Sequence, residues 1–581
     1  MLAEFRRRHL AFSGLAAALL CGAPLAPAAA AVEGAAPPAP TLAASQPGNY
    51  LAGLIASADR DTAAAEVYYR EALRIDPRNP DLIDRVFSAS LANGDVSGAT
   101  ALAERLLARD PGNRLAHLAL ATSQIGRGEY AAARQQLLTK DAAQARDVTG
   151  ALLIAWCYAG QGDQRHALDT LDRIRDPGVV AFRDFHAGLI ADQLGNAAEA
   201  QRRLKAAYDS DKNALRFADA YARFLAAHGD RDGAIKVYDD FSVAAPHHPI
   251  VDRALAGLKA GRSLPAFVST PKDGAAEVLY GLGAAGLRQD DEMPALVYLR
   301  LSLYLRPGDD LTSVSLANLF EQMKKDDAAI AAYESVAAAS PLHEDAEIQA
   351  ALVLDNDGQS GEAIKRLEAL VEANPHDAEA LSALAGVQRS AKKYKEAAAA
   401  YDKAIAAVGI PTRDNWTLFY FRGICYERAK EWPKAEEDFK KALELFPEQP
   451  LVLNYLGYSW VDQGVNLDEA FKMLRRAVEL RPNDGYIVDS LGWAHFKLGH
   501  YAEATQTLER AVDLKPSDPV LNDHLGDAYW RVDRKVEAHF QWNHARDMKP
   551  EPEDLPAILK KIDEGLPDAG GAAASQPAGG G

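Results

Sequence analysis

Residues 485–516 read GYIVDSLGWAHFKLGHYAEATQTLERAVDLKP, and residues 520–550 read VLNDHLGDAYWRVDRKVEAHFQWNHARDMKP. A shift of 34 residues aligns the glycine, alanine and proline positions of the two stretches: Gly492 with Gly526, Ala504 with Ala538, and Pro516 with Pro550. Self-similarity at such a period is typical of repeat proteins, in which each unit is one small supersecondary structure. The fold of the whole chain therefore depends on how many such units it contains.

An alanine recurs along the chain and marks one position of each unit. Most steps between successive copies are 34 residues long, with longer steps before Ala295 and Ala435. A second small residue, Gly or Ala, precedes this alanine by twelve positions in most units, and Phe87 breaks that pattern. The recurring alanines are Ala65, Ala99, Ala133, Ala167, Ala200, Ala234, Ala295, Ala329, Ala363, Ala397, Ala435, Ala470, Ala504 and Ala538.

Two small residues at this spacing predict a pair of antiparallel helices in each unit. Helices joined by a short turn come closest where they cross, and small side chains permit that approach. Prolines such as Pro77 and Pro516 close the second helix, because proline cannot continue a helix. Glycines such as Gly94 and Gly499 fall in the turn between the two helices. We therefore predict an all-α fold, an α-solenoid of about 14 helix-turn-helix repeats stabilised by stacking.

The period breaks at residues 249–275, which predicts an irregular seam between two arrays. The first array covers residues 46–248 with six repeats, and the second covers residues 276–552 with eight. Within the seam we expect a lone helix at residues 249–262 and extended chain at residues 264–274, where two prolines and a glycine fall. The pattern leaves open whether the seam is a hinge or a rigid joint.

A final helix is predicted at residues 553–565. Apolar residues recur there at helical spacing from Leu555 to Ile562, and charged residues such as Lys560 and Lys561 lie on the opposite side. We expect this helix to cap the last repeat.

Residues 1–31 have the pattern of a secretory signal peptide, with three consecutive arginines, an apolar run and small residues suited to cleavage. This predicts an exported, periplasmic protein. The alternative is an outer-membrane lipoprotein anchored through Cys21, although such sites need a small residue just before the cysteine and Leu20 is not small. The Pro/Ala-rich residues 32–45 and the Gly/Ala-rich residues 566–581 are predicted to be a disordered spacer and a disordered tail.

The composition excludes some partners. A formal net charge of −18 disfavours nucleic acid and favours partner proteins or peptides with basic segments. No transmembrane segment is predicted, and membrane anchoring would require lipidation of Cys21. Cys157 and Cys425 lie in apolar helical patterns of distant repeats, so we expect them to be small core residues.

No motif in the chain predicts catalytic, metal-binding or cofactor-binding residues. The run Gly281-Leu-Gly283-Ala-Ala-Gly286 matches GxGxxG, but that dinucleotide motif needs a preceding strand within a βαβ unit. Here the three glycines fall in the first helix of a unit, and Gly283 is that unit's small residue. We therefore expect these glycines to serve helix packing, in a chain that is not an enzyme and needs no cofactor.

The units resemble tetratricopeptide (TPR) repeats, most closely from residue 416 to residue 550. The resemblance implies a right-handed superhelix whose first helices line a concave groove that binds peptides or other proteins. With the signal pattern, the chain looks like an exported or periplasmic TPR protein of the Gram-negative, proteobacterial type. The residues that carry the resemblance are Leu456-Gly457, Leu491-Gly492 and Leu525-Gly526, with Tyr426, Trp460 and Tyr529 at the aromatic position.

In the TPR family, positions five and nine of each repeat point into the groove. The resemblance implies a ligand- or peptide-binding band of aromatic, amide and carboxylate side chains: Tyr420, Ile424, Asn454, Tyr458, Asp489, Trp493, Asp523 and Asp527. An asparagine can pair with a peptide backbone, aromatic rings can anchor a ligand, and carboxylates would favour a ligand with Lys or Arg. The alternative is that some of these side chains pack between repeats and that the acids are only solvated.

These observations predict a non-enzymatic scaffold or adaptor in the bacterial cell envelope. Partner proteins or peptides would bind in the concave TPR groove. One alternative is an accessory subunit of envelope or polysaccharide assembly and export, which would bind a glycan through the aromatic groove. Another is an adaptor of a C-terminal-processing protease. The repeats do not choose among these roles.

Overall fold

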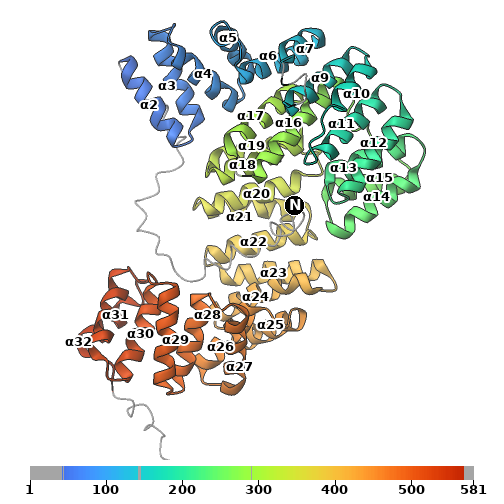
Figure 1. Cartoon of the computed structure of the whole chain (residues 1–581). Helices are drawn as coiled ribbons and strands as arrows, with labels where there is room; N and C mark the ends of the chain where they lie inside the picture. The colour runs from blue at the N-terminus through green and yellow to red at the C-terminus, as the bar shows by residue number, and fades with distance from the viewer. Residues whose placement is uncertain (1–41, 43–44, 140, 142–145, 290, 568–581) are drawn as a thin grey trace, which may run out of the picture. The chain divides into compact units, whose positions relative to one another are not determined.

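The computed structural model describes residues 42, 45–139, 141, 146–289 and 291–567, and the regular elements of these residues are helices (Figure 1). The described residues form two compact units, residues 42–367 and residues 368–567. Among the described helices, none is long and apolar enough to cross a membrane.

The unit of residues 42–367 consists of successive helices, and α21 (Ser360–Ala373) crosses into the next unit. Their bounds are α2 (Gln46–Ala58), α3 (Thr62–Ile75), α4 (Pro80–Asn93), α5 (Val96–Leu107), α6 (Arg114–Gly126), α7 (Tyr130–Leu137), α9 (Val148–Gly160), α10 (Gln164–Leu171), α11 (Val180–Gln193), α12 (Ala197–Ser210), α13 (Leu215–Ala227), α14 (Arg231–Ala244), α15 (Pro249–Lys259), α16 (Pro271–Arg288), α17 (Glu292–Leu305), α18 (Asp310–Gln322), α19 (Asp326–Glu334) and α20 (His343–Asn356).

The unit of residues 368–567 continues with further helix pairs and ends in a single helix. Their bounds are α22 (Ala378–Ser390), α23 (Tyr394–Val408), the short 3₁₀ helix η1 (Arg413–Asn415), α24 (Trp416–Arg428), α25 (Trp432–Leu445), α26 (Pro450–Gln463), α27 (Leu467–Leu480), α28 (Gly485–Lys497), α29 (Tyr501–Leu514), α30 (Pro519–Arg531), α31 (Lys535–Asp547) and α32 (Leu555–Glu564).

The two small residues of each unit pack as predicted. Every one of the recurring alanines lies in the second helix of a pair and is at most 2% exposed. A β-carbon added at Gly492 would lie 2.7 Å from the side chain of Leu508, and one added at Gly526 would lie 2.5 Å from the Trp542 ring. Because such contacts are closer than carbon atoms tolerate, the two helices of a pair approach as far as their small residues allow. The predicted all-α solenoid of helix pairs is confirmed.

Turn residues set the ends of the helices. The Asp518 side chain accepts the backbone N–H of Val520 at 2.9 Å, and Pro519 occupies the first turn of α30. Asn and Asp are favoured at this position because they satisfy the free N–H groups of a helix N-terminus. Gly499, between α28 and α29, has φ of 80°, a left-handed conformation that glycine adopts without strain.

The seam differs from its prediction. Its lone helix is α15, but α16 already begins at Pro271, so the prediction of extended chain through Gly274 was wrong. The hydroxyl of Thr270 accepts the N–H of Asp273, and the Asp273 carboxylate accepts the N–H of Thr270. This capping box, with proline in the first turn, starts the helix at Pro271, before the predicted start of the second array at residue 276.

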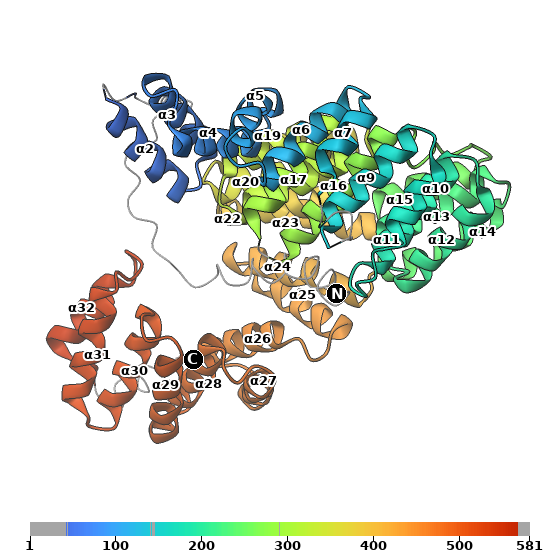
Figure 2. The same ribbon diagram turned by 45° about the horizontal axis from the view of Figure 1, so that its top comes forward.

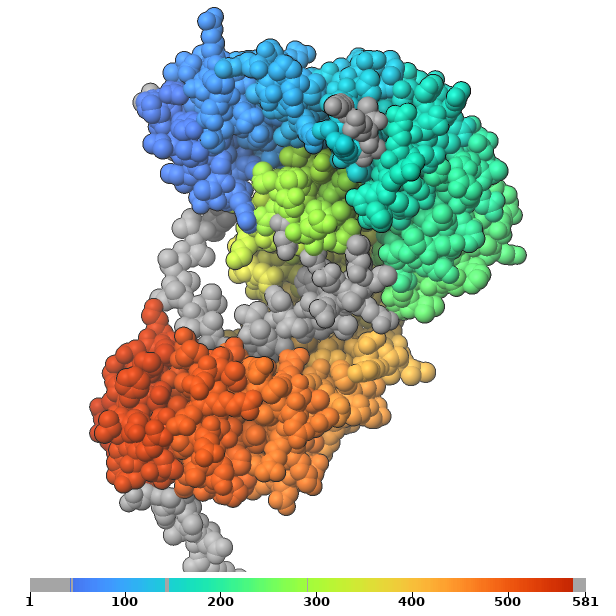
Figure 3. Space-filling view, in the orientation of Figure 1, coloured from blue at the N-terminus to red at the C-terminus, as the bar shows by residue number. Residues whose placement is uncertain are grey.

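The helix pair after the seam, α16 and α17, folds back onto the first array. These helices pack against α4, α6, α9 and α11, the first helices of four earlier pairs (Figure 2). Figure 3 shows the lime surface near residue 300 seated between the blue and teal surfaces of the first array. Residues 249–275 therefore lie inside one compact unit, and the division between units falls in α21 instead.

Close contacts fix α16 on the first array. Gly274 leaves room for the buried Trp156 ring, which would lie 2.2 Å from a β-carbon at that position. The Arg216 guanidinium of α13 forms a two-pronged ion pair with Glu277 of α16, with Nε and Oε1 at 2.8 Å. Glu277 is 3% exposed, so this ion pair is formed largely away from water. The contacts are those of a core rather than of a loosely bound segment.

The three glycines of the GxGxxG match lie in α16 and serve packing on two sides. Gly281 faces the Phe182 ring of α11, where a β-carbon would lie 2.6 Å from ring atoms. Gly283 and Gly286 face α17, where a β-carbon would meet Leu299 at 2.8 Å and Ala295 at 3.2 Å respectively. The run therefore lets one helix approach two neighbours.

Cys157 and Cys425 are buried and unpaired, which confirms their prediction as core residues. Burial raises the pKa of each thiol to about 12, so neither forms a thiolate at neutral pH.

The C-terminal helix α32 packs against α31 as a cap and buries Ile558. The chain beyond it is also held, because Trp530 donates its indole N–H to the Leu566 carbonyl at 3.1 Å. Pro567 accepts a hydrogen bond from Arg531 at 2.7 Å. The prediction of a disordered tail from residue 566 was therefore wrong for its first two residues. The rest of the tail, the signal pattern with Cys21, and nearly all of the predicted spacer at residues 32–45 lie outside the described residues.

Candidate functional site

The predicted groove residues lie on α24, α26, α28 and α30, the first helices of the last four pairs. The structure places Tyr420 differently from the prediction, because its side chain is 3% exposed. Its ring lies among Phe421, Phe439 and Tyr455, with centroids 5.2–6.1 Å away. Ile424, one turn further along α24, is also buried. These two residues therefore belong to the core between repeats.

Asn454 and Tyr458 lie one turn apart on α26, so they share a helix face, and both are half-buried. The Asn454 Oδ1 atom is buried and has no hydrogen-bond partner among the described residues. A buried amide oxygen without a donor costs free energy, so this atom is a favourable acceptor for an incoming N–H group.

Trp493 lies on α28, a first helix that packs against α26, and is half-buried. Its indole is nearly parallel to the His524 ring at a centroid distance of 4.0 Å and to the Phe496 ring at 4.8 Å. The Lys497 ammonium lies 5.5 Å from the indole centre. The ring is thus held rigidly, which is the property of an aromatic anchor.

Asp489 is not the open carboxylate that the sequence predicted. It is 6% exposed, and both of its oxygens lie 3.0 Å from Nδ1 of His524 on the next first helix. Burial alone would lower the pKa of His524, but the charge and hydrogen bond of Asp489, together with the charges of Asp523 and Asp527, raise it above its ordinary value. The hydrogen bond with His524 therefore holds the Asp489 carboxylate within the chain.

Asp523 and Asp527 of α30 are also paired within the chain. Lys561 of the cap donates to Asp523 Oδ2 at 2.7 Å and to Asp527 Oδ2 at 2.8 Å. The other oxygen of Asp527 accepts the indole N–H of Trp542 at 2.9 Å. Burial, and then the neighbouring charge of Asp523, raises the pKa of Asp527. The prediction that Lys561 faces solvent was wrong, because its ammonium bridges the two carboxylates.

His524 and Lys561 are the residues that the sequence analysis missed. Lys561 follows the buried Ile558 by three residues, which places both on one side of a helix, and that spacing was a usable signal. No comparable signal marks His524, because its pairing with Asp489 depends on how two helices 35 residues apart are stacked.

The resulting site has two parts. Asp489 is paired with His524, and Asp523 and Asp527 share the single Lys561 ammonium, which weakens the reason to expect a basic ligand there. Asn454, Tyr458 and Trp493 remain partly exposed on adjacent first helices, and they can offer a hydrogen-bond acceptor and aromatic surface to a ligand. We call these three residues the amide–aromatic face.

Comparisons with known proteins agree with the helix pairs. Family models described as tetratricopeptide repeat match residues 47–79, 90–149, 348–409, 416–449 and 456–519.

Two curated relatives match part of the chain. TPR repeat-containing protein PA4667 of Pseudomonas aeruginosa is 26% identical over 210 residues, covering 34% of this chain and 32% of that protein. BBSome complex member BBS4 of Bos taurus is 26% identical over 154 residues, covering 26% of this chain and 28% of that protein. The match thus spans about a third or less of each relative.

Among solved structures, the APC/C hetero-tetramer Cut9-Hcn1 aligns with 90% of this chain and 96% of that chain, at 14% identity and a TM-score of 0.37. The family models and the buried small residues of successive helix pairs lead to the same conclusion: the chain belongs to the tetratricopeptide repeat family.

Proposed function

We propose that this chain is a non-enzymatic scaffold or adaptor of the bacterial cell envelope that binds a segment of a partner protein on the amide–aromatic face. TPR repeats are protein-interaction modules, which supports the general class. The pattern of residues 1–31 supports export. The observation that carries the proposal is the buried Asn454 oxygen, which lacks a donor among the described residues and lies on the same helix face as Tyr458.

The partner segment presents its backbone rather than a basic side chain. A peptide N–H completes the hydrogen bonding of Asn454 Oδ1, while apolar side chains of the segment lie on Tyr458 and Trp493. The three carboxylates nearby are already paired with His524, which joins α28 to α30, and with Lys561, which joins the cap to α30, so we do not expect them to select the partner.

The test is photocrosslinking in cells with a photoreactive residue at Asp462, one turn beyond Tyr458 on α26, where the side chain is 59% exposed. We expect a discrete protein adduct. A matched probe at Glu469, 57% exposed on the second helix α27, should give none.

The same crosslink should fall at least tenfold in the variants Asn454→Ala and Trp493→Ala, while their helicity stays unchanged. Equal adducts at both probe positions, or an adduct that both variants retain, would refute the proposal. An adduct with polysaccharide instead of protein would mean that the partner is a glycan.

A further inference from the structure

The seam builds a cleft that the repeat pattern does not predict. It has a volume of about 690 Å³ and lies between α15, the segment that follows it, and the connection from α19 to α20. Its walls are partly apolar, with Ile250, Leu264 and Pro341 among the lining residues. This volume falls within the range of sites that hold a small molecule.

Three arginines from different elements line this cleft: Arg223 of α13, Arg253 of α15 and Arg262 of the segment after α15. Arg253 donates to the Ala339 carbonyl at 2.5 Å, and Arg223 donates to the Pro265 carbonyl at 3.1 Å. These bonds to backbone oxygens hold two guanidinium groups at the cleft without neutralising them.

The positive charge of the cleft is only partly balanced. Arg223 is paired with Asp219 at 2.8 Å, whereas neither Arg253 nor Arg262 forms an ion pair among the described residues. Asp310 is the one acidic residue among those that line the cleft, and its Oδ1 accepts the backbone N–H of Ala337 at 3.0 Å. A cleft with an excess of positive charge is unexpected in a chain with a net charge of −18.

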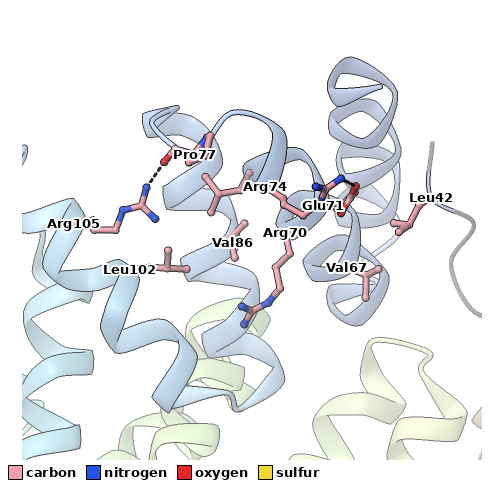
Figure 4. Close-up of a pocket in the computed structure, with 10 residues that line it drawn as sticks. Leu42, Val67, Arg70, Glu71, Arg74, Pro77, Val86, Leu102 and Arg105 are labelled. Atoms are coloured by element: carbon pink, nitrogen blue, oxygen red, sulfur yellow. Dashed lines mark hydrogen bonds and ion pairs between the residues drawn. The ribbon is translucent and has the colours of Figure 1, made fainter. Parts of the chain in front are cut away.

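The pocket at the first repeat shows what a compensated cluster looks like. It has a similar volume, about 670 Å³, and is also lined by three arginines, of which Arg74 turns toward Glu71 (Figure 4). Arg70 pairs with Glu66 and Asp95, and Arg74 pairs with Glu71 at 2.8 Å. Arg105, the third arginine, forms no ion pair among the described residues and donates to the Pro77 carbonyl. Two of the three arginines of that pocket are therefore paired with acids, against one of three in the seam cleft.

We propose that the seam cleft is a binding site for a small anionic molecule. Its carboxylate or phosphate group is held by Arg253 and Arg262, and its apolar part lies on Ile250 and Leu264. Guanidinium groups suit both anions, because their planar N–H donors bind two oxygens at once. The site is independent of the amide–aromatic face, since it lies in residues 42–367.

The test is isothermal titration calorimetry of the full chain with inorganic phosphate and, separately, with succinate, at fixed ionic strength. We expect saturable 1:1 binding of at least one anion, and the preferred anion identifies the head group. The double variant Arg253→Gln/Arg262→Gln should weaken binding at least tenfold, because it removes both charge-assisted contacts. Asp310→Asn should tighten binding severalfold, because it removes the opposing charge and keeps an acceptor for Ala337.

The matched control is Arg165→Gln/Arg175→Gln, which removes the same charge from exposed positions of the same unit. Binding to this control should equal that of the wild type. Absence of saturable binding of both anions to the wild type would overturn the proposal. Equal losses in the two double variants would also overturn it, since the effect would then reflect net charge alone.

Discussion

The first helices of the repeats meet different surroundings in the two compact units. In residues 42–367, α16 and α17 pack onto α4, α6, α9 and α11, so the chain covers its own first-helix face with a complete helix pair. In residues 368–567, the corresponding face leaves Tyr458 and Trp493 half-exposed, and its acids form side-chain pairs such as Asp489–His524.

This difference shows that a run of repeats does not by itself define a free binding groove. The same unit, with the same buried alanine and close helix crossing, provides a surface for internal packing in one region and a partly open face in the other. What decides between them is whether another part of the chain reaches the face. The following predictions test how firmly each face is occupied.

The largest effect is expected from Glu277→Gln, which breaks the ion pair that joins α16 to α13. Removing one partner of a buried pair leaves an uncompensated charge, so this variant should lower the free energy of unfolding of residues 42–367 by about 3 kcal/mol. Urea unfolding followed by hydrogen-exchange mass spectrometry on α9 and α16 peptides measures the change.

Glu292→Gln is the matched control, because Glu292 also joins the folded-back pair to the first array, through an ion pair of 2.8 Å with the exposed Arg60. An exposed pair contributes at most about 1 kcal/mol. Similar effects of the two substitutions would mean that α16 and α17 are not part of the core of this unit.

A smaller effect is expected from Lys561→Met in the other unit. Without the ammonium, Asp523 and Asp527 lose their shared cation, and the cap should be destabilised by about 1–2 kcal/mol, below the cost of a fully buried pair. Faster hydrogen exchange confined to α30 and α32 is the expected result. Lys560→Met, at a position 72% exposed, should change nothing measurable. Loss of structure throughout residues 368–567 would show instead that the cap supports the whole unit.

The smallest effects concern two histidines, His186 and His524, whose pKa values are shifted in opposite directions by folding. Burial, and then the Arg216 charge, lowers the pKa of His186 to about 3 from its ordinary value of 6.5. Its stabilising contribution is therefore present above pH 6.5 and is lost as the pH falls toward 3. The pKa of His524 is raised, so its contribution is present below pH 6.5 and is lost as the pH rises through the folded-state pKa.

Between pH 7.5 and 5.5, the α9–α11 region should lose about 1 kcal/mol of stability through His186, and the α28–α30 region should gain stability through His524. Urea unfolding at each pH, with pulsed hydrogen exchange at a common labelling pH, separates the two regions. The substitutions His186→Asn and His524→Asn should each remove the pH dependence of the free energy of unfolding in their own region. If the free energy of unfolding changed with pH in the same direction in both regions, the opposite pKa shifts of His186 and His524 would be contradicted.

The sequence predicts the repeats well because their signals are local. The spacing of Gly526 and Ala538 reflects one helix crossing, and a crossing depends on residues of a single unit. The capping helix is predictable for the same reason, because the apolar spacing that marks it, from Leu555 to Ile562, lies within one helix.

The sequence does not predict which first-helix faces are covered by other parts of the chain. The position of Tyr420 follows the family pattern, but the aromatic side chains around it bury its ring. The packing of α16 on α9 leaves no periodic signal, because it joins helices more than 100 residues apart. Lys561 was placed on the side opposite the apolar residues of its helix, and its partners are revealed by the positions of Asp523 and Asp527 in space.

The fold-back of α16 and α17 also determines when the first unit can finish folding. Thr149 bonds to Tyr298 across 149 residues, Ala92 to Arg300 across 208, and Arg60 to Glu292 across 232. In a simple solenoid each repeat needs only its neighbours, so the chain can fold progressively as it is synthesised. Here the early repeats expose apolar first-helix surface until residue 305 has been made, and closing such long loops is slow. The early repeats thus depend on a segment synthesised after them.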